Sequence, residues 1–312
     1  MLISYNSKCS FFILDKVRYN QNLFDPLLIV TIVNNILLIV FMNTESLSKI
    51  IESKLNDNIN ELSTQYFSNK ENVTSKFFII DNLLPENIPL EVYNNFPAKE
   101  EFSYSDTFRE RKFTFKKLNA LKNPIVNDVT NAFQMNNVIN AIERITKTQY
   151  LNGDPSLYAG GISRMDFGHF LNPHIDNSHD ANRERYRRFN LLYYVTPDIK
   201  EIYGGNFELW NKEVKTPLKI ESKFNRLVVI ETTKYSAHSV DPVLSKIKRC
   251  CVSNYYFSKQ SPEDYEYYHV TSFFGRPEEK FNRIYGKFDN FIRNNFSKIT
   301  GISRKKGDIR SK

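Results

Sequence analysis

Three side chains that commonly bind metal ions follow one another in a set order. His174 and Asp176 are separated by one residue, and His238 follows later in the chain. Residues i and i+2 of a β-strand point to the same side of the sheet, so His174 and Asp176 would share one face. Two neutral imidazoles and one carboxylate form the ligand set of non-heme Fe(II) sites with open coordination positions. The residue types and their spacing therefore predict an iron site.

A cation follows the second histidine. Arg249 lies eleven residues after His238, about one strand later. Its planar guanidinium can pair with a carboxylate through two parallel hydrogen bonds. Arg249 could therefore hold the distal carboxylate of a dicarboxylic acid that is chelated to the metal. We expect a dioxygenase that uses Fe(II), O2 and 2-oxoglutarate.

The elements that would carry these residues are short and β-rich. Between residues 156 and 258, apolar runs alternate with turn signals at a spacing typical of a sandwich or barrel rather than of βαβ units. The expected strands are Leu157–Met165, His169–Asp176, Phe189–Val195, Phe207–Trp210, Arg226–Ile230 and Arg249–Phe257.

Helices are expected on both sides of this β-rich region. Apolar residues recur at steps of three and four over residues 44–68 and 127–149, and Asn43 or Thr44 could cap the first helix. The chain again has helical spacing after Pro277. Two further strands are expected in the N-terminal half, within Lys76–Pro85 and Lys112–Phe115.

The positive charge of the chain is concentrated in two places. The formal net charge is +8, of which the tail Arg304–Lys312 carries +4 and the run Arg183–Arg188 carries +3. A terminal basic tail is usually solvated, so we expect no nucleic-acid partner. We expect Arg183–Arg188 to be a solvated loop face. The alternative is that this cluster attracts an anionic substrate or carrier, because it follows the ligands directly.

The cysteines and the N-terminus bear on the compartment. Cys9, Cys250 and Cys251 form no disulfide framework, which favours a reducing compartment and a cytoplasmic enzyme. Residues 27–42 are apolar, but they are short for a membrane span and contain two central asparagines. We expect no membrane partner and keep an anchor at residues 27–42 as the minority reading. A start at Met42 is a further alternative.

Residues 156–258 resemble the prolyl-4-hydroxylase-like branch of the Fe(II)/2-oxoglutarate oxygenases. The resemblance is carried by five segments in the family's order: Gly168–Asn177 with Pro173-His174-Ile175-Asp176, Arg187–Thr196, Tyr203–Trp210 with Gly204-Gly205, Ala237–Val240, and Arg249–Ser253. It implies a mostly β core, a double-stranded β-helix or jelly roll, with N- and C-terminal helices in an α+β chain.

The resemblance implies a role for each matching residue. His174, Asp176 and His238 would bind iron as the catalytic centre, and Arg249 would pair with the C5 carboxylate of 2-oxoglutarate. Four further residues would belong to the co-substrate pocket: Met165, Asn190, Cys251 and Ser253. Cys251 and Met165 depart from the family, which often has Ser and Tyr at these positions. Ser253 could supply the missing hydroxyl from the same face of the strand.

These inferences give four expected segments. Residues 1–41 form a hydrophobic extension, 42–150 a helical and mixed support region, 151–260 the jelly-roll core, and 261–312 a C-terminal helix with the basic tail.

The resemblance also sets the expected reaction. Related halogenases have a small residue where this chain has Asp176, so the carboxylate favours hydroxylation or desaturation, with release of succinate and CO2. An amino acid, a peptidyl proline or a small metabolite could be the substrate, and L-ascorbate is a candidate cofactor through the resemblance alone. Two alternatives belong to other classes of protein. They are a non-catalytic jelly-roll binding module that retains its metal ligands and a membrane-tethered partner protein.

Overall fold

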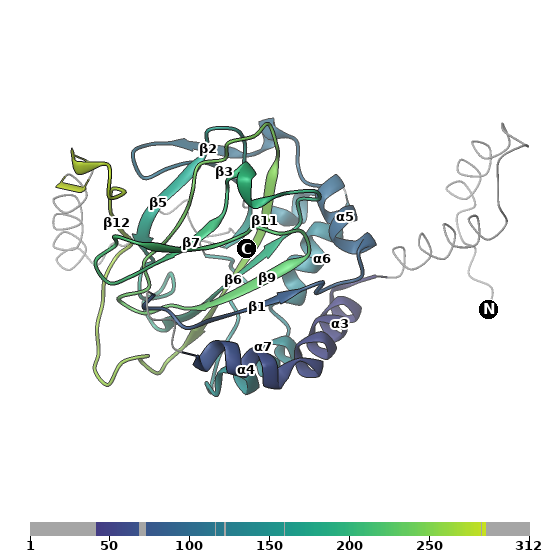
Figure 1. Cartoon of the computed structure of the whole chain (residues 1–312). Helices are drawn as coiled ribbons and strands as arrows, with labels where there is room; N and C mark the ends of the chain where they lie inside the picture. Colours follow the sequence, from purple (N-terminus) through teal and green to yellow (C-terminus); the bar gives the residue numbers. More distant parts are fainter. Residues whose placement is uncertain are drawn as a thin grey trace, which may run out of the picture. The chain divides into compact units, whose positions relative to one another are not determined.

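The computed structural model describes residues 42–68, 73–115, 117–121, 123–158, 160–281 and 283–284. Its named elements all belong to the unit Asn43–Lys312 (Figure 1). The predictions for residues 1–41, for the basic tail and for most of the helix after Pro277 lie outside the described residues. No helix within the described ranges is long and apolar enough to cross a membrane.

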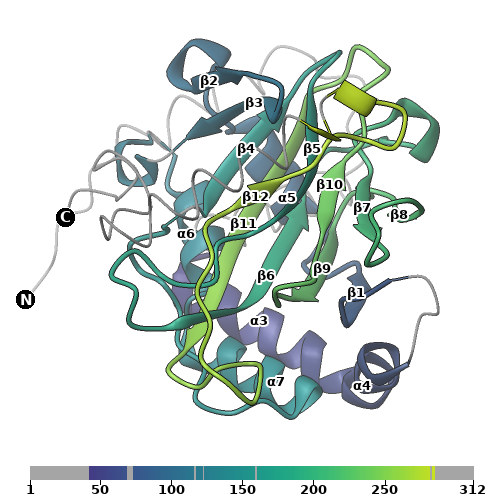
Figure 2. The same ribbon diagram turned by 90° about the vertical axis from the view of Figure 1, so that its left-hand side faces the viewer.

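An antiparallel sheet that curls on itself forms the core (Figure 2). Its strands are β1 (Phe77–Asp81), β2 (Ser103–Asp106), β3 (Glu110–Phe115), β4 (Gly161–Met165), β5 (Phe170–Ile175), β6 (Tyr186–Tyr194), β7 (Phe207–Trp210), β8 (Pro217–Ile220), β9 (Arg226–Glu231), β10 (His238–Val240), β11 (Arg249–Ser258) and β12 (Ser272–Phe273). Their order is β1-β9-β6-β11-β4-β3-β5-β10-β7-β8, with β12 beside β5 and β2 beside β3. The prediction of a jelly-roll core in an α+β chain is confirmed.

Strand β3 joins the two halves of the sheet. Thr114 near its end pairs with Ser163 of β4, whereas Glu110 at its start pairs with Leu171 of β5. A strand that the sequence placed in the N-terminal support region is therefore part of the wall of the core. Strand β1, from the same region, extends the other end of the sheet by pairing with β9.

Helices cover the outside of the sheet. They are α3 (Thr44–Asp57), α4 (Ile59–Phe67), α5 (Asn87–Asn94), α6 (Ile125–Ala132) and α7 (Asn136–Thr146), and short 3-10 turns lie at Lys99–Glu101, Leu118–Ala120 and Glu201–Tyr203. Helix α3 packs against α6 and α7, while α4 packs on β1 and α6 packs on β11 (Figure 1). Apolar faces of these helices are buried against one another and against the sheet.

Each of the two long helices predicted in the N-terminal half is broken, which corrects that prediction. The first is capped by Asn43, whose side chain accepts a hydrogen bond from the Ser46 amide, and it stops at Asn58, whose side-chain amide donates to the Lys54 carbonyl. The second is interrupted after α6. There Phe133 accepts a hydrogen bond from the Tyr256 hydroxyl, and Gln134 bonds to Asn254 of β11. Contacts with β11 thus override the helical pattern.

Several short elements had no strong sequence signal. Helix α5 and strands β2, β8, β10 and β12 were not predicted. Strands of two to four residues are too short to show an alternating pattern. Their places are set by the strands with which they pair.

An apolar cluster fills one end of the roll. Its buried members come from six strands on both halves of the sheet: Phe77, Tyr194, Phe207, Leu209, Ile220, Val228, Ile230 and Cys251. The other end is not closed in this way, and polar side chains face the interior there. The packing therefore leaves a cavity inside the roll.

The helical layer offers a direct test of this packing. Ile142 of α7 is fully buried, so Ile142→Ala should lower the free energy of unfolding by about 2–5 kcal/mol. Urea unfolding of the full chain measures this change. Asn140→Ala, at an exposed position of the same helix, should change it by less than about 0.5 kcal/mol. Equal effects of the two substitutions would contradict the packing described here.

Candidate metal centre and active-site cavity

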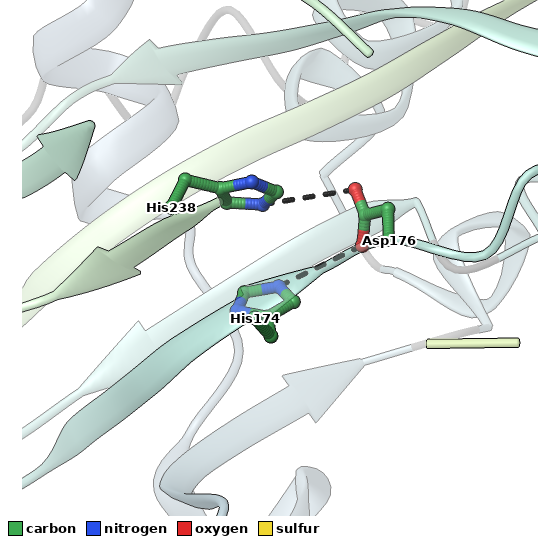
Figure 3. Close-up of side chains that lie close together, drawn as sticks. All are labelled: His174, Asp176 and His238. Atoms are coloured by element: carbon green, nitrogen blue, oxygen red, sulfur yellow. Dashed lines mark ion pairs between the residues drawn. The ribbon is translucent and has the colours of Figure 1, made fainter. Parts of the chain in front are cut away.

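The pairing of β5 with β10 brings the three predicted ligands together. His174 lies opposite His238 in the register, and their ring centroids are 4.2 Å apart. Asp176 follows directly after β5. The Nε2 atom of His174 is 3.6 Å from Oδ1 of Asp176, and Nε2 of His238 is 3.7 Å from Oδ2 (Figure 3). One ligand atom from each of the three residues lies within 4.8 Å of the others.

Each histidine is oriented by a hydrogen bond on the far side of its ring. Nδ1 of His174 is 3.0 Å from the carbonyl oxygen of Asn172, and Nδ1 of His238 is 2.9 Å from that of Ser236. A carbonyl oxygen can only accept, so each Nδ1 carries the proton and each Nε2 presents its lone pair to the centre. Phe273 of β12 stacks on His174 and fixes its ring further.

The charge states suit a divalent cation. Burial lowers the pKa of His238 to about 4, even though Asp176 acts in the opposite direction. Burial would raise the pKa of Asp176, but Arg187 and the two histidines hold it well below its usual range. At neutral pH the centre therefore presents a neutral His238 and an anionic Asp176. This convergent nitrogen and carboxylate donor set fits an Fe(II) ion.

Arg187 overturns one prediction from the sequence. Arg183–Arg188 was expected to be a solvated loop face, which is wrong for Arg187 and Arg188, since β6 buries them to 1% and 9% exposure. Nη1 of Arg187 lies 3.1 Å from Oδ2 of Asp176, and its guanidinium lies 3.9 Å from the ring centroid of Tyr255. A register shift between Tyr256 and Phe257 of β11 accompanies this placement. The sequence of a charged run does not show which of its residues will be buried beside an opposite charge.

A cavity of about 390 Å³ adjoins the three ligands inside the roll. All residues that the resemblance placed in the co-substrate pocket line this cavity with the ligands: Met165, Asn190, Arg249, Cys251 and Ser253. Strand β11 contributes Arg249, Cys251 and Ser253 as alternate residues of one face. The structure therefore brings together the site residues that were predicted from positions far apart in the chain.

The guanidinium of Arg249 is held from one side. Its Nε donates to the carbonyl of Gly205 at 2.6 Å and to the Ser222 hydroxyl at 3.2 Å. Gly205 has φ +74°, and a Cβ there would lie 2.9 Å from Cδ of Arg249, so only glycine permits this approach. Nη1 donates to Sδ of Met165 at 3.7 Å, a weak acceptor, so Nη1 and Nη2 can still pair with an anion in the cavity.

Tyr194 belongs to the apolar cluster and packs beside Arg249, a contact that the sequence analysis did not predict. The Arg249 guanidinium lies 5.0 Å from its ring centroid. Burial raises the pKa of its hydroxyl above the usual range, although Arg249 and Ser222 act in the opposite direction, so the hydroxyl stays protonated. The alternation Asn190, Leu192, Tyr194 along β6 was the signal that could have placed it beside the pocket.

Comparison with known proteins agrees with this geometry. Residues 144–257 match the family model described as the 2OG-Fe(II) oxygenase superfamily, and this region holds the three ligands and Arg249. The chain contains a 2OG-Fe(II) oxygenase domain. This oxygenase is an Fe(II)- and 2-oxoglutarate-dependent dioxygenase, so the predictions of family, of enzyme class and of Fe(II) and 2-oxoglutarate as cofactors are confirmed.

Several solved structures are similar to the oxygenase at low identity. A prolyl hydroxylase from Trichoplax adhaerens, in complex with a hypoxia inducible factor oxygen degradation domain peptide fragment, is 20% identical, covers 70% of this chain and 95% of that chain, and has a TM-score of 0.48. A Pseudomonas putida prolyl-4-hydroxylase is 15% identical and covers 66% and 100%, with a TM-score of 0.45. HygX from Streptomyces hygroscopicus, with nickel and 2-oxoglutarate bound, is 13% identical and covers 59% and 84%, with a TM-score of 0.40. No curated protein matches the sequence.

Loss of Arg187 should destabilise the metal-free oxygenase. Arg187→Met leaves the buried Asp176 carboxylate without its cation, which should cost about 3–5 kcal/mol. A bound divalent cation would replace that partner, so Co(II) should raise the melting temperature more in this variant than in the wild type. Thermal unfolding with and without Co(II) measures both effects. Arg183→Met, from the same run of charges, serves as the control, and equal stabilities of the two variants would refute the ion-pair account.

Lowering the pH should reduce the free energy of unfolding of the metal-free protein at pH values well above those at which carboxylates titrate. Burial lowers the pKa of both His238 and His269 to about 4. The unfolded chain takes up these protons near pH 6.5, so stability is present above that pH and is lost as pH falls toward 4. Urea unfolding at pH 7.5, 6, 5 and 4.5 should show this loss, and His269→Gln should reduce it. A free energy of unfolding that stays constant across this window would disprove it.

Proposed function

We propose that the oxygenase is a hydroxylase of the prolyl-4-hydroxylase-like type that holds Fe(II) through His174, Asp176 and His238. In this reaction one atom of O2 enters a C–H bond of the substrate. The other enters succinate, as 2-oxoglutarate is oxidised and loses CO2. The single observation that carries the proposal is the convergence of the three ligand atoms on a cavity that also contains Arg249. When bound, the metal would hold the keto acid and activate O2.

The residues around Arg249 suit a dicarboxylic acid. Arg249 would bind the distal carboxylate, and the protonated Tyr194 hydroxyl beneath it would add a neutral donor. Cys251 stands where a hydroxyl is common in the family. Burial raises the pKa of its thiol to about 11, so it stays neutral and does not repel a carboxylate. Ser253 offers a hydroxyl one step further along the same face.

The reaction type and setting follow from further residues. The carboxylate of Asp176 occupies the position that a halide would need, which favours hydroxylation over halogenation. Cys250 and Cys251 are buried and free, which supports a reducing, cytoplasmic setting. L-Ascorbate would serve as the reductant that maintains Fe(II). A small molecule or a peptide is the substrate.

The cofactor chemistry can be tested without knowing the substrate. The full-length protein is mixed with Fe(II) in the absence of oxygen and titrated with 2-oxoglutarate, while the visible metal-to-ligand charge-transfer band is recorded. We expect a band in the wild type and none in His238→Ala. Arg249→Met should need at least about thirty times more 2-oxoglutarate, and Tyr194→Phe about five to ten times more.

The controls separate a lost pocket from a damaged fold. Lys219→Met removes an exposed cation of β8 outside the cavity and should leave the titration unchanged. Iron bound by the wild type without any band would refute the proposal and would favour the non-catalytic binding module.

A further inference from the structure

The cavity wall carries a pair of opposite charges in addition to the three metal ligands and Arg249. Glu110 and Lys112 of β3 both line the cavity and form an ion pair of 2.8 Å. Their side chains are 24% and 21% exposed, so they are largely withdrawn from solvent. Strand β3 lies outside residues 144–257, the region that matches the family model. These charges therefore lie outside the part of the chain that matches the family model.

The strand geometry places the pair between the metal centre and β11. Alternation along β3 puts Glu110, Lys112 and Thr114 on the cavity side, whereas Arg111 pairs with Asp106 away from it. Glu110 is opposite Leu171 on the strand that carries His174. The Lys112 ammonium, 2.8 Å away, outweighs the effect of burial and lowers the pKa of Glu110, so Glu110 is anionic. Lys112 in turn is among the cations that act on Cys251 of β11.

A second acceptor lies beside the metal ligands. Asn177 follows Asp176 directly and lines the same cavity, and its Nδ2 donates to the carbonyl of His179. Its Oδ1 is buried and has no hydrogen-bond partner among the residues that the structure describes. An unsatisfied buried acceptor costs about 1–3 kcal/mol, so this atom favours a ligand with a hydrogen-bond donor. Glu110 and Asn177 thus offer acceptors on the same cavity as the cation of Lys112.

We propose that the substrate of this oxygenase is a free α-amino acid, whose ammonium group binds Glu110 and whose carboxylate binds Lys112. A zwitterion supplies one charge of each sign and can meet the ion pair head to tail, so that no net charge is buried. A residue inside a peptide carries neither charge on its backbone. A neutral metabolite would offer no charged group to Glu110 or Lys112, which would then interact only with each other. This inference rests on the proposed function, since it concerns the same cavity.

The experiment uses the full-length protein with Fe(II) and 2-oxoglutarate bound. Each of the twenty common free L-amino acids is tested for a shift of the charge-transfer band without oxygen and for faster succinate formation with oxygen. The N-acetyl and carboxamide derivatives of each active amino acid are compared with the parent. We expect at least one free amino acid to be active and each derivative to bind about tenfold or more weakly.

Variants of β3 test which of the two side chains binds the ammonium group and which binds the carboxylate. Glu110→Gln should weaken the free amino acid about tenfold or more, should leave the 2-oxoglutarate titration unchanged, and should abolish the penalty of N-acetylation. Lys112→Met should weaken binding of the free amino acid to a similar extent and should abolish the penalty of the carboxamide. Lys112→Arg keeps the positive charge and should bind the free amino acid as the wild type does. Arg111→Met removes a cation from the opposite face of the same strand and should behave as the wild type.

The outcomes distinguish this inference from the proposed function. A normal band with no active free amino acid would overturn the inference and leave the proposed function in place. Derivatives as active as the parent, or equal effects of Arg111→Met and Lys112→Met, would also overturn it. Absence of the band in the wild type would overturn the proposed function and this inference with it.

Discussion

The metal centre depends on the register between β5 and β10. Because His174 lies opposite His238, two residues far apart in the chain present their Nε2 atoms to one point, and Asp176 reaches the same point from the end of β5. A slip of one residue would turn one histidine to the other face of the sheet. The register is held by the pairing of β10 with β7 on its other side and by β12, whose Phe273 stacks on His174.

Burying such a centre requires that each charge has a partner inside the roll. Asp176 has Arg187 at 3.1 Å, and Arg187 in turn lies over Tyr255. Arg249 is held by a backbone carbonyl and a hydroxyl, which fix it without neutralising it. Breaking a buried pair costs several kcal/mol, so these contacts make the interior polar but rigid. The Arg249 cation, left without a carboxylate partner in these contacts, is the group suited to an anionic co-substrate.

Strand β3 contributes the charged residues Glu110 and Lys112 to the cavity wall. It pairs with both β4 and β5, so one of its faces lines the cavity. This face places one anion and one cation beside the metal centre. The rest of the core serves the cofactors through residues of β5, β6, β10 and β11. A segment from the N-terminal half of the chain therefore lines the cavity beside the metal centre.

The sequence by itself determined the family, the jelly-roll core and the cofactors, because five segments carry the resemblance in the family's order and hold the two histidines and the aspartate. Only the tertiary structure decided the roles of the neighbouring residues. Arg187 looked like one member of a solvated basic run until β6 buried it beside Asp176. Glu110 and Lys112 gave no signal, and nothing in the sequence placed Tyr194 beside Arg249. A local pattern reports periodicity along one strand, whereas burial and pairing of a charge depend on which distant strand lies across from it.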